Sequence, residues 1–233
     1  MQMAISNDFK TGIFIKELKN RFLCEVEIDS KPVVCYVPSS CHLSNFLKLY
    51  KKEVLLVPTA TPKSRTPYAP FAVPYKRNFI VLNTSMATRA IETSIRSRLF
   101  SYLGKRAIVK KEHSVSGYKC DLYIEDTDTI VEIKSVISTN IKALFPTVYS
   151  ERTIKQLQQL QSSLCLGKNA CFCIVSLHPY LKEVVIDQST EFYTELKRCM
   201  DMGLRLRAYT TRLSGNALKV EHEIPISFIG GRN

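Results

Sequence analysis

The sequence predicts a mixed α/β protein in which an all-β N-terminal part is followed by an α/β part. Short segments of alternating polarity fill residues 13–37, which is typical of hairpin-rich β structure. From residue 78 the apolar period changes to that of a helix, and helix and strand patterns then alternate up to residue 223. Apolar residues make up 45% of the 233 residues. This is enough to bury a core in one or two domains and excludes disorder as the main state.

The first part begins with strand patterns and a turn. The segments IFIKEL, RFLCEVEI and VVCYV alternate in polarity, and the residues DSKP at 29–32 form a turn before the last of them. Half of the ten prolines then fall between residues 57 and 75. Because proline lacks a backbone N–H and fixes φ, this stretch is predicted to be neither helix nor central strand. It is interpreted as a crossover between domains, with edge pairing left open.

The second part is predicted to form an α/β layer with mixed pairing. Apolar residues recur at helical spacing over residues 86–103, and Gly104 is expected to end this helix. Strands are expected at 106–112, 119–124, 129–136, 171–177, 205–211 and 217–223, and further helices at about 151–165 and 188–202. An order of helix, three strands, helix and strand describes such a layer.

The charge balance indicates a polyanionic partner. Lys and Arg number 33 against 21 Asp and Glu, a formal charge of +12, and basic residues are dense between Arg89 and Lys111. Such a surface attracts nucleic acid, although a solvated helix face and strand edge would give the same local pattern. The chain shows neither an apolar run of about 18 residues nor a signal peptide. The protein is therefore expected to be cytoplasmic and without a membrane partner.

Motifs for several cofactors are missing from the sequence. The eight cysteines include no CxxC pair and the four histidines are scattered, so a zinc or histidine metal site is not expected. The cysteines are interpreted as buried apolar residues. The patterns GxxxxGK[ST] and GxGxxG are absent, so no nucleotide cofactor is predicted.

The segment CDLYIEDTDTIVEIKSV at residues 120–136 carries the strongest chemical signal. Two alternating strands meet at a polar turn near residues 127 and 128. If the hairpin closes there, Asp121 lies opposite or diagonal to Glu132 and Lys134, while Val131 and Ile133 face the core. Two carboxylates and one ammonium then meet on one face. The alternative is an ordinary solvent-facing pair of Glu and Lys.

This grouping suits metal-assisted hydrolysis of a phosphodiester. Asp121 and Glu132 are hard oxygen ligands for Mg²⁺ or Mn²⁺, and they leave most metal positions to water and phosphate. A bound ion polarises the phosphate and lowers the pKa of a bound water. Lys134 is predicted to orient the nucleophile or to offset charge on the phosphoryl oxygens. Glu92 or Glu112 is a candidate third carboxylate, although each is more simply read as a surface acid.

The hairpin and its flanks resemble two known groups of proteins. Asp121 followed by Glu-Ile-Lys at 132–134 is similar to the PD-(D/E)XK nuclease signature. The blocks NRFLCEVEI, FIVLNTSMATRAIETSI, YIEDTDTIVEIKSV and FPTVYSERTIKQLQQL resemble the sugar fermentation stimulation protein A (SfsA) family in order and spacing. The resemblance implies an N-terminal OB-like β-barrel over residues 1–77. It further implies a PD-(D/E)XK restriction-endonuclease-like α/β domain over residues 78–233.

The resemblance also implies contacts to nucleic acid. The basic residues that match family positions are Arg21, Arg89, Arg152 and Lys155. Arg152 and Lys155 are three residues apart, so they are expected on one face of a helix. One departure from the family is that its His in the RGxKHL segment is Gln156 here. Because glutamine cannot titrate, no general base is expected at this position.

The sequence thus predicts a divalent-metal-dependent DNA or RNA nuclease with little base readout. A non-enzymatic, non-specific DNA-binding regulator stays open as an alternative, and it would show salt-sensitive binding without turnover. A structural protein whose basic surface meets an acidic partner also stays open.

Overall fold

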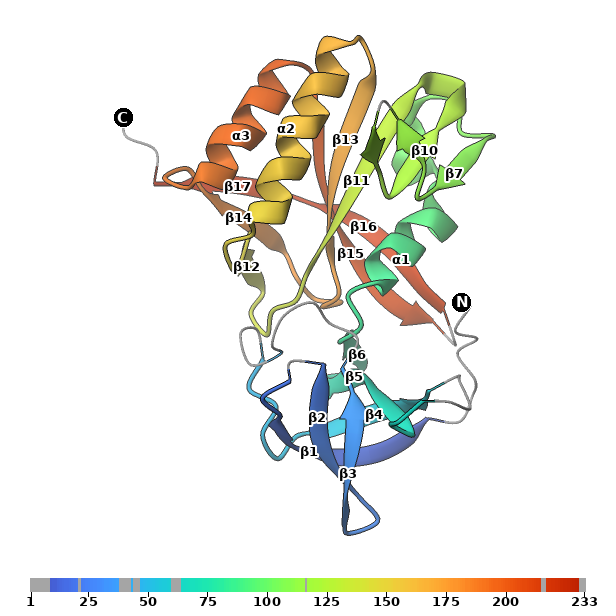
Figure 1. Ribbon diagram of the computed structural model, residues 1–233, viewed down its shortest axis with the longest axis vertical. Coiled ribbons are helices and arrows are strands. Elements are labelled where there is room, and N and C mark those ends of the chain that lie inside the picture. The colour runs from blue at the N-terminus through green and yellow to red at the C-terminus, as the bar shows by residue number, and fades with distance from the viewer. Residues whose placement is uncertain are drawn as a thin grey trace.

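The chain folds as a curled N-terminal β-sheet joined to an α/β region built on a second sheet (Figure 1). This computed structural model describes residues 9–230 except 21, 38–42, 44–46, 60–63, 116 and 215–216. The first sheet lies at the bottom of Figure 1 and the second sheet, with its helices, lies above it. The mixed α/β class predicted from the sequence is confirmed.

The first sheet is antiparallel, with strand order β3-β2-β1-β4-β5-β6. Its strands are β1 (Lys10–Glu17), β2 (Leu23–Ile28), β3 (Lys31–Tyr36), β4 (Glu53–Pro58), β5 (Tyr68–Tyr75) and β6 (Asn78–Val81). Side chains such as Val26 and Leu56 are buried on one face while their neighbours are exposed. β3 contacts β5 across the sheet, so the sheet curls into a half-barrel. Its last strand, β6, lies wholly after residue 77 and pairs with β5, and the division of domains at residues 77 and 78 stays a prediction.

The turn between β2 and β3 is tighter than predicted. Only Asp29 and Ser30 form it, with φ of 51° and 60°, and such a pair matches the twist of the flanking strands. Lys31 and Pro32, predicted as part of the turn, begin β3 instead. Pro32 is tolerated there because β3 is the edge strand of the sheet.

The proline-rich stretch departs most from its prediction. The sequence predicts no central strand over residues 57–75, but β5 lies between β4 and β6. Pro70 pairs with Leu56 where the register shifts, and Pro74 lies next to the turn that leads to β6. At both positions the strand pairing is already interrupted or about to end, so the missing N–H groups leave the sheet intact. The prediction is wrong because composition does not show which N–H groups a sheet needs.

The second sheet is mixed, with strand order β16-β15-β13-β11-β10-β7. Its strands are β7 (Val109–Lys111), β10 (Leu122–Ile124), β11 (Thr129–Val136), β13 (Asn169–Ser176), β15 (Arg205–Ser214) and β16 (Ala217–Ile224). β11, β13 and β15 run parallel, and antiparallel neighbours flank them on both sides. The predicted mixed pairing is therefore confirmed, and β11 has the predicted bounds.

Helices cover both faces of this second sheet. α2 (Glu151–Cys165) and α3 (Glu191–Asp201) lie side by side on one face, and α1 (Met86–Ser94) packs on the other (Figure 1). Ser150 and Thr190 cap α2 and α3, because each side chain accepts a hydrogen bond from a backbone N–H of the first turn. In the part of the chain that the structure describes, none of the helices is long and apolar enough to cross a membrane.

α1 is shorter than the helix predicted over residues 86–103. It ends at Ser94, and a 3₁₀ segment, η2 (Arg98–Leu103), follows before Gly104. Arg106 Nε donates to the carbonyl oxygen of Ile95 at 2.8 Å, and the Ser94 hydroxyl accepts from the Val220 N–H at 3.2 Å. These hydrogen bonds from distant residues are made to Ser94 and Ile95, at the point where the helix would have continued. Gly104 ends η2 with a φ of 73°, as predicted for the end of a helix.

Short strands were not predicted from the sequence. β12 (Lys142–Leu144), β14 (Glu183–Asp187) and β17 (Ile226–Ile229) form a small parallel sheet, and β8 (Ser114–Val115) pairs with β9 (Tyr118–Lys119). These strands are too short to show a period of alternation. In the small sheet, the partners are also far apart in the chain.

Apolar cores lie on both faces of the second sheet. Val131 and Ile133 point into the core that joins this sheet to α1 and the first sheet. Ile130 and Phe172 point into the other core, beneath α2 and α3. Polar side chains on the α2 face of β11 therefore also enter the protein interior. The described cysteines other than Cys165 are buried, as the sequence predicts.

Candidate metal centre and nucleic-acid interface

The hairpin of β10 and β11 brings the predicted acids together. Leu122 pairs with Val131 and Ile124 with Thr129, so the same register places Asp121 opposite Glu132. A short 3₁₀ turn, η3 (Glu125–Thr127), connects the strands. We call Asp121, Glu132 and Lys134 the carboxylate–lysine cluster.

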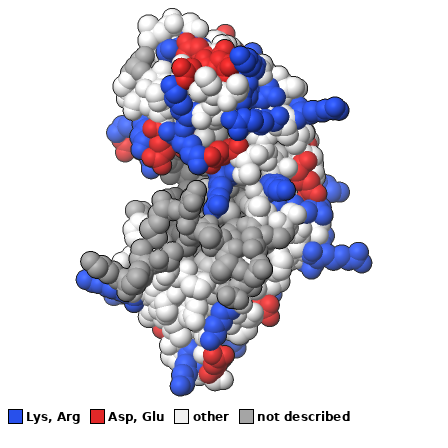
Figure 2. Space-filling view, turned by 90° about the vertical axis from the view of Figure 1, so that its right-hand side faces the viewer, with Lys and Arg blue, Asp and Glu red and all other residues white. Residues whose placement is uncertain are grey.

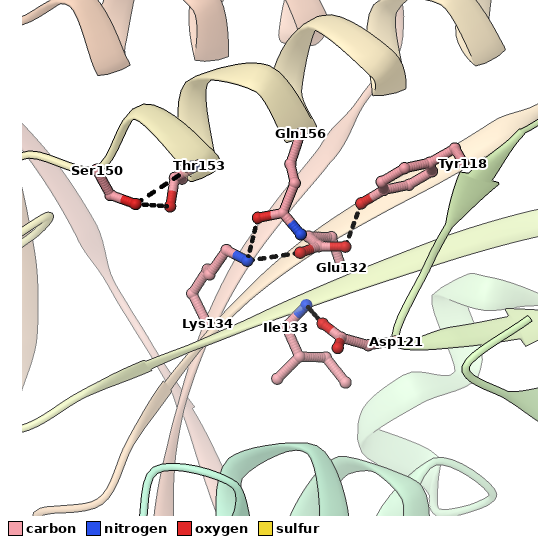
Figure 3. Close-up of polar contacts among 8 residues, drawn as sticks. All are labelled: Tyr118, Asp121, Glu132, Ile133, Lys134, Ser150, Thr153 and Gln156. Carbon is pink, nitrogen blue, oxygen red and sulfur yellow. Dashed lines mark hydrogen bonds and ion pairs between the residues drawn. The ribbon is translucent and has the colours of Figure 1, made fainter. Parts of the chain in front are cut away.

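Glu132 is buried although it carries a carboxylate. It is 1% exposed, because α2 covers this face of β11. One of its oxygens accepts from the Tyr118 hydroxyl, and the other accepts from Lys134 Nζ at 2.6 Å (Figure 3). The alternative of an ordinary solvent-facing pair therefore does not describe Glu132. A buried carboxylate with charged and neutral donors is instead a fixed element of the site.

Asp121 lies directly before β10 begins, and its carboxylate takes the place of a backbone acceptor for β11. Its Oδ2 accepts from the Ile133 N–H at 2.8 Å (Figure 3). Burial, and then the negative charge of Glu132, raise the pKa of Asp121 to about 6. The Ile133 N–H and the charges of Lys134 and Arg152 act in the opposite direction. The two carboxylates are thus close enough to repel each other.

Lys134 is held by partners from two elements. Its Nζ donates to Glu132 Oε1 at 2.6 Å and to Gln156 Oε1 at 2.7 Å. Gln156 reaches down from α2, as Figure 3 shows. A glutamine amide oxygen can accept from an ammonium at any pH, whereas a protonated histidine could not. The residue that departs from the resembled family therefore orients the cluster's amine.

Tyr118 is a site residue that the sequence analysis missed. It belongs to β9, is 4% exposed, and donates its hydroxyl to Glu132. Burial and the charge of Glu132 raise its pKa above the ordinary tyrosine value, so the phenol stays protonated and remains a donor. No spacing pattern links a tyrosine in a separate short hairpin to the acids, so the sequence offered no signal for it.

The cluster fits a small divalent cation held by two carboxylates. Burial and the charge of Glu132 raise the pKa of Asp121 in spite of Lys134 and Arg152, so a further cation would stabilise the ionised pair, and a carboxylate has lone pairs beyond those used in the hydrogen bonds above. Mg²⁺ commonly takes one or two carboxylates and completes its shell with water and phosphate. Within the described ranges, no group of three or more His, Cys, Asp or Glu side chains gathers. The candidate third carboxylates pair with lysines instead: Glu92 with Lys111 at 2.5 Å and Glu112 with Lys119 at 2.6 Å.

A groove along α2 reaches the cluster at Lys134. A hollow of about 650 Å³ is lined by Lys134, Tyr149, Arg152 and Gln156, among others. A second hollow, of about 500 Å³, is lined by Tyr118 and again by Arg152 and Gln156. Because the hollows share these two residues, they adjoin along α2. We call the two hollows together the α2 groove.

The predicted nucleic-acid residues fall into different places. Arg152 lines both hollows, and Lys155 lines the second. Arg89 is exposed on α1, which packs on the other face of the sheet, and it lines neither hollow. Arg21 lies outside the described residues. The structure thus places Arg152 beside Lys134 in the larger hollow and Lys155 in the neighbouring one, and it places Arg89 in neither.

The basic segment between Arg89 and Lys111 is largely compensated locally. Lys110 pairs with Glu125 at 2.5 Å and Lys105 with Asp126 at 3.4 Å. Arg96 donates to the carbonyl oxygen of Ala107 at 3.0 Å. Figure 2 shows the right-hand side of the molecule in Figure 1, and toward the top of that view acidic side chains lie next to basic ones. This segment therefore has the character of a solvated mixed-charge surface.

Comparison with known proteins gives a consistent family. The family model described as "Sugar fermentation stimulation protein RE domain" matches residues 85–217. The "Sugar fermentation stimulation protein homolog" of Ruminiclostridium cellulolyticum is 24% identical, covering 94% of this chain and 97% of the relative. The homolog of Thermoanaerobacter pseudethanolicus is 26% identical, covering 96% of this chain and 99% of the relative.

A solved structure shows the same fold over nearly the whole chain. It is that of Pyrococcus furiosus SfsA in complex with Ca²⁺, with a TM-score of 0.81 and 19% sequence identity. The match covers 97% of this chain and 99% of that chain. The resemblance carried by the sequence blocks is confirmed, and this chain belongs to the sugar fermentation stimulation protein (SfsA) family.

Proposed function

We propose that this protein is a divalent-metal-dependent hydrolase of phosphodiester bonds in DNA or RNA. The observation that carries the proposal is the carboxylate–lysine cluster itself, in which Asp121, Glu132 and Lys134 meet beside a groove lined by Arg152. The resemblance to PD-(D/E)XK nucleases rests on the same three residues. A buried carboxylate whose pKa is raised, as it is for Asp121, is typical of functional sites when it lies near a groove.

Asp121 and Glu132 are the residues that would hold Mg²⁺ or Mn²⁺. The P. furiosus relative was solved in complex with Ca²⁺, which supports a divalent cation as the ligand in this chain too. When bound, such an ion polarises a phosphate and lowers the pKa of a water. Because the pKa of Asp121 is about 6, its carboxylate is largely ionised only above that pH. Metal binding is therefore expected to strengthen as the pH rises through 6.

The remaining side chains of the site position charge for the reaction. Lys134 is fixed by Glu132 and Gln156, so its ammonium is in place to stabilise negative charge on the phosphoryl oxygens. Tyr118 holds the Glu132 carboxylate from the other side. Arg152 is exposed in the groove and can bind a neighbouring phosphate.

A non-enzymatic DNA-binding protein is the second candidate, and one observation favours it. Lys134 already has two acceptors, Glu132 and Gln156, and among the described side chains no third carboxylate joins the pair. The cluster could then be a buried polar network beneath a binding surface. Such a protein would bind DNA in a salt-dependent manner and would not cleave it.

A cleavage assay separates these candidates. Labelled single- and double-stranded DNA and RNA are incubated with the full chain and Mg²⁺ or Mn²⁺, and the fragments are resolved on a gel. Asp121→Asn and Glu132→Gln are expected to lose about a hundredfold or more of the rate while retaining binding. Asp201→Asn, an exposed carboxylate on α3 that pairs with Lys197, is the matched control and should cleave normally.

The outcomes are distinct. Intact substrates after incubation of the wild-type chain with saturating metal, together with measurable binding, would support the second candidate. Equal cleavage by the wild-type chain and both cluster variants would show that the activity comes from elsewhere.

A further inference from the structure

Tyr149 is a large aromatic side chain left uncovered at the edge of the α2 groove. It is 69% exposed and lines the larger hollow together with Arg152. Its hydroxyl donates to Glu191 Oε2 at 3.2 Å, so α3 restrains the ring from one end. Tyr149 also directly precedes Ser150, the N-cap of α2, which anchors the backbone here. The ring is thus tethered at its hydroxyl and at its backbone while much of its surface remains open to solvent.

The groove around this ring carries few uncompensated cations. Lys155 pairs with Glu151 at 2.7 Å and Lys119 pairs with Glu112 at 2.6 Å. Arg152 forms no ion pair with any residue that the structure describes. Exposed lysines that already have an acidic partner add little net attraction for phosphate.

An exposed aromatic ring with few unpaired cations around it favours a single strand over a duplex. Duplex binding without base readout depends on many phosphate contacts, which this groove does not offer. A single strand gains in addition from stacking of a base on an aromatic ring, roughly 1–3 kcal/mol per base. Bases inside a duplex are stacked on one another and cannot use such a ring without unpairing. An open tyrosine beside one arginine that has no ion pair among the described residues therefore suits an unpaired nucleotide.

We propose that the α2 groove takes a single-stranded stretch of nucleic acid, with one unpaired base stacked on Tyr149 and an adjoining phosphate bound by Arg152. This inference rests on the proposed function, since it places the strand beside the carboxylate–lysine cluster. It extends that function by naming the substrate class: single strands or unpaired ends, of DNA or RNA. Stacking is tolerant of base identity, so little sequence preference accompanies it.

Binding measured without turnover tests the inference separately from hydrolysis. Fluorescence anisotropy of a short labelled DNA strand, its RNA counterpart and the matching duplex gives the Kd of each for the full chain in metal-free buffer. Tyr149→Ala is expected to weaken binding of a single strand by about 5- to 150-fold and to change duplex binding by a much smaller factor. The DNA and RNA arms show which strand is preferred.

Two variants control for folding and for the tyrosine hydroxyl. Tyr149→Phe keeps the ring and loses the bond to Glu191, so it should retain most of the single-strand affinity. Tyr50→Ala removes a tyrosine of similar exposure, 66%, that does not line the α2 groove, and it should leave the ratio of single-strand to duplex affinity unchanged.

Each result decides between the claims. Wild-type single-strand affinity in Tyr149→Ala, or an equal loss for single strand and duplex, overturns the inference and leaves metal-dependent cleavage untouched. A selective loss for single strands supports it, even if the wild-type chain cleaves nothing and the proposed hydrolysis fails. Absence of binding to all three probes also overturns the inference, and the metal-dependent cleavage assay then decides the proposed hydrolysis by itself.

Discussion

Polar clusters of opposite character lie on the two faces of the second sheet. The carboxylate–lysine cluster lies on the α2 face of β11. On the other face, Tyr209 donates its hydroxyl to Tyr102 at 2.8 Å, the Tyr102 hydroxyl lies 3.4 Å from Cys171 Sγ, and this sulfur lies 3.5 Å from Cys173 Sγ. We call these four residues the tyrosine–cysteine cluster. The register of β11 and β13 places Cys173 beside Ile133 and Phe172 beside Glu132, which separates the two faces.

The comparison shows what distinguishes a site from a core network. Burial raises the pKa of both Tyr102 and Tyr209, so these phenols stay neutral, and their hydroxyls satisfy each other. The carboxylate–lysine cluster holds charges that repel one another and borders a groove. A satisfied neutral network stabilises a fold, whereas repelling buried charges reduce its stability. The second arrangement is the one that a bound cation would stabilise.

The largest expected effect, on the cleavage rate, comes from removing the amine of the carboxylate–lysine cluster. Lys134→Met deletes the ammonium that offsets phosphoryl charge, so cleavage should fall by about a hundredfold or more. Mn²⁺ affinity should rise, because the two carboxylates lose a competing cation. Cleavage rates and titration calorimetry with Mn²⁺ measure both quantities. A loss of Mn²⁺ affinity in Lys134→Met would indicate that the lysine helps to build the metal site instead of competing with it.

The raised pKa of Asp121 should make the free energy of unfolding depend on pH. Its pKa is about 6 in the folded chain against 3.8 for an ordinary aspartate, so the folded state binds this proton more tightly. The wild-type chain therefore loses stability as the pH rises from about 4 to 6, and Asp121→Asn, which does not titrate, avoids that loss. In metal-free buffer at pH 8 the variant should be about 1 to 3 kcal/mol more stable, as measured by urea unfolding.

The same experiment carries its own control. Below about pH 4 the wild-type carboxylate is protonated in both states, so the two chains should have equal free energies of unfolding. A wild-type chain that is more stable than Asp121→Asn at pH 8 without metal would show that the carboxylates are not in conflict.

Removing a polar group from the tyrosine–cysteine cluster should lower the stability of the protein, whereas Asp121→Asn should raise it, and the change should be smaller. Tyr209→Phe removes the hydroxyl that donates to Tyr102, which should lower the free energy of unfolding by about 1 kcal/mol. Cleavage and Mn²⁺ affinity should be unchanged, because this cluster lies on the other face of the sheet. Urea unfolding and calorimetry on the same preparation check this. A changed Mn²⁺ affinity would mean that the two faces are coupled through β11 or β13.

The sequence predicts the carboxylate–lysine cluster better than it predicts the side chains that hydrogen-bond to that cluster. Alternation along β11 and a polar turn are local features, so they are enough to predict Asp121 opposite or diagonal to Glu132. Tyr118 and Gln156 come from other elements, and only tertiary folding brings them to the hairpin. The same holds for the tyrosine–cysteine cluster, in which Tyr102 reaches β13 and β15 across a long stretch of chain.

The fold was likewise predictable only where a local pattern in the sequence determines it. β11 and α2 have their predicted bounds, because long periodic segments carry their own signal. β5 was missed because its prolines are acceptable only where the pairing is interrupted, and α1 ends early because Arg106 bonds to Ile95. β12, β14 and β17 depend on partners far along the chain, which no local pattern reveals.

A crystal of the full chain soaked with Mn²⁺ tests the central claim most directly. Anomalous scattering locates the ion independently of any assumed chemistry. Our account predicts one strong peak at about 2.0 to 2.3 Å from oxygens of both Asp121 and Glu132, and its disappearance in Asp121→Asn. A saturated crystal with no peak between these two carboxylates, and with Lys134 still closing the pair, would contradict the account.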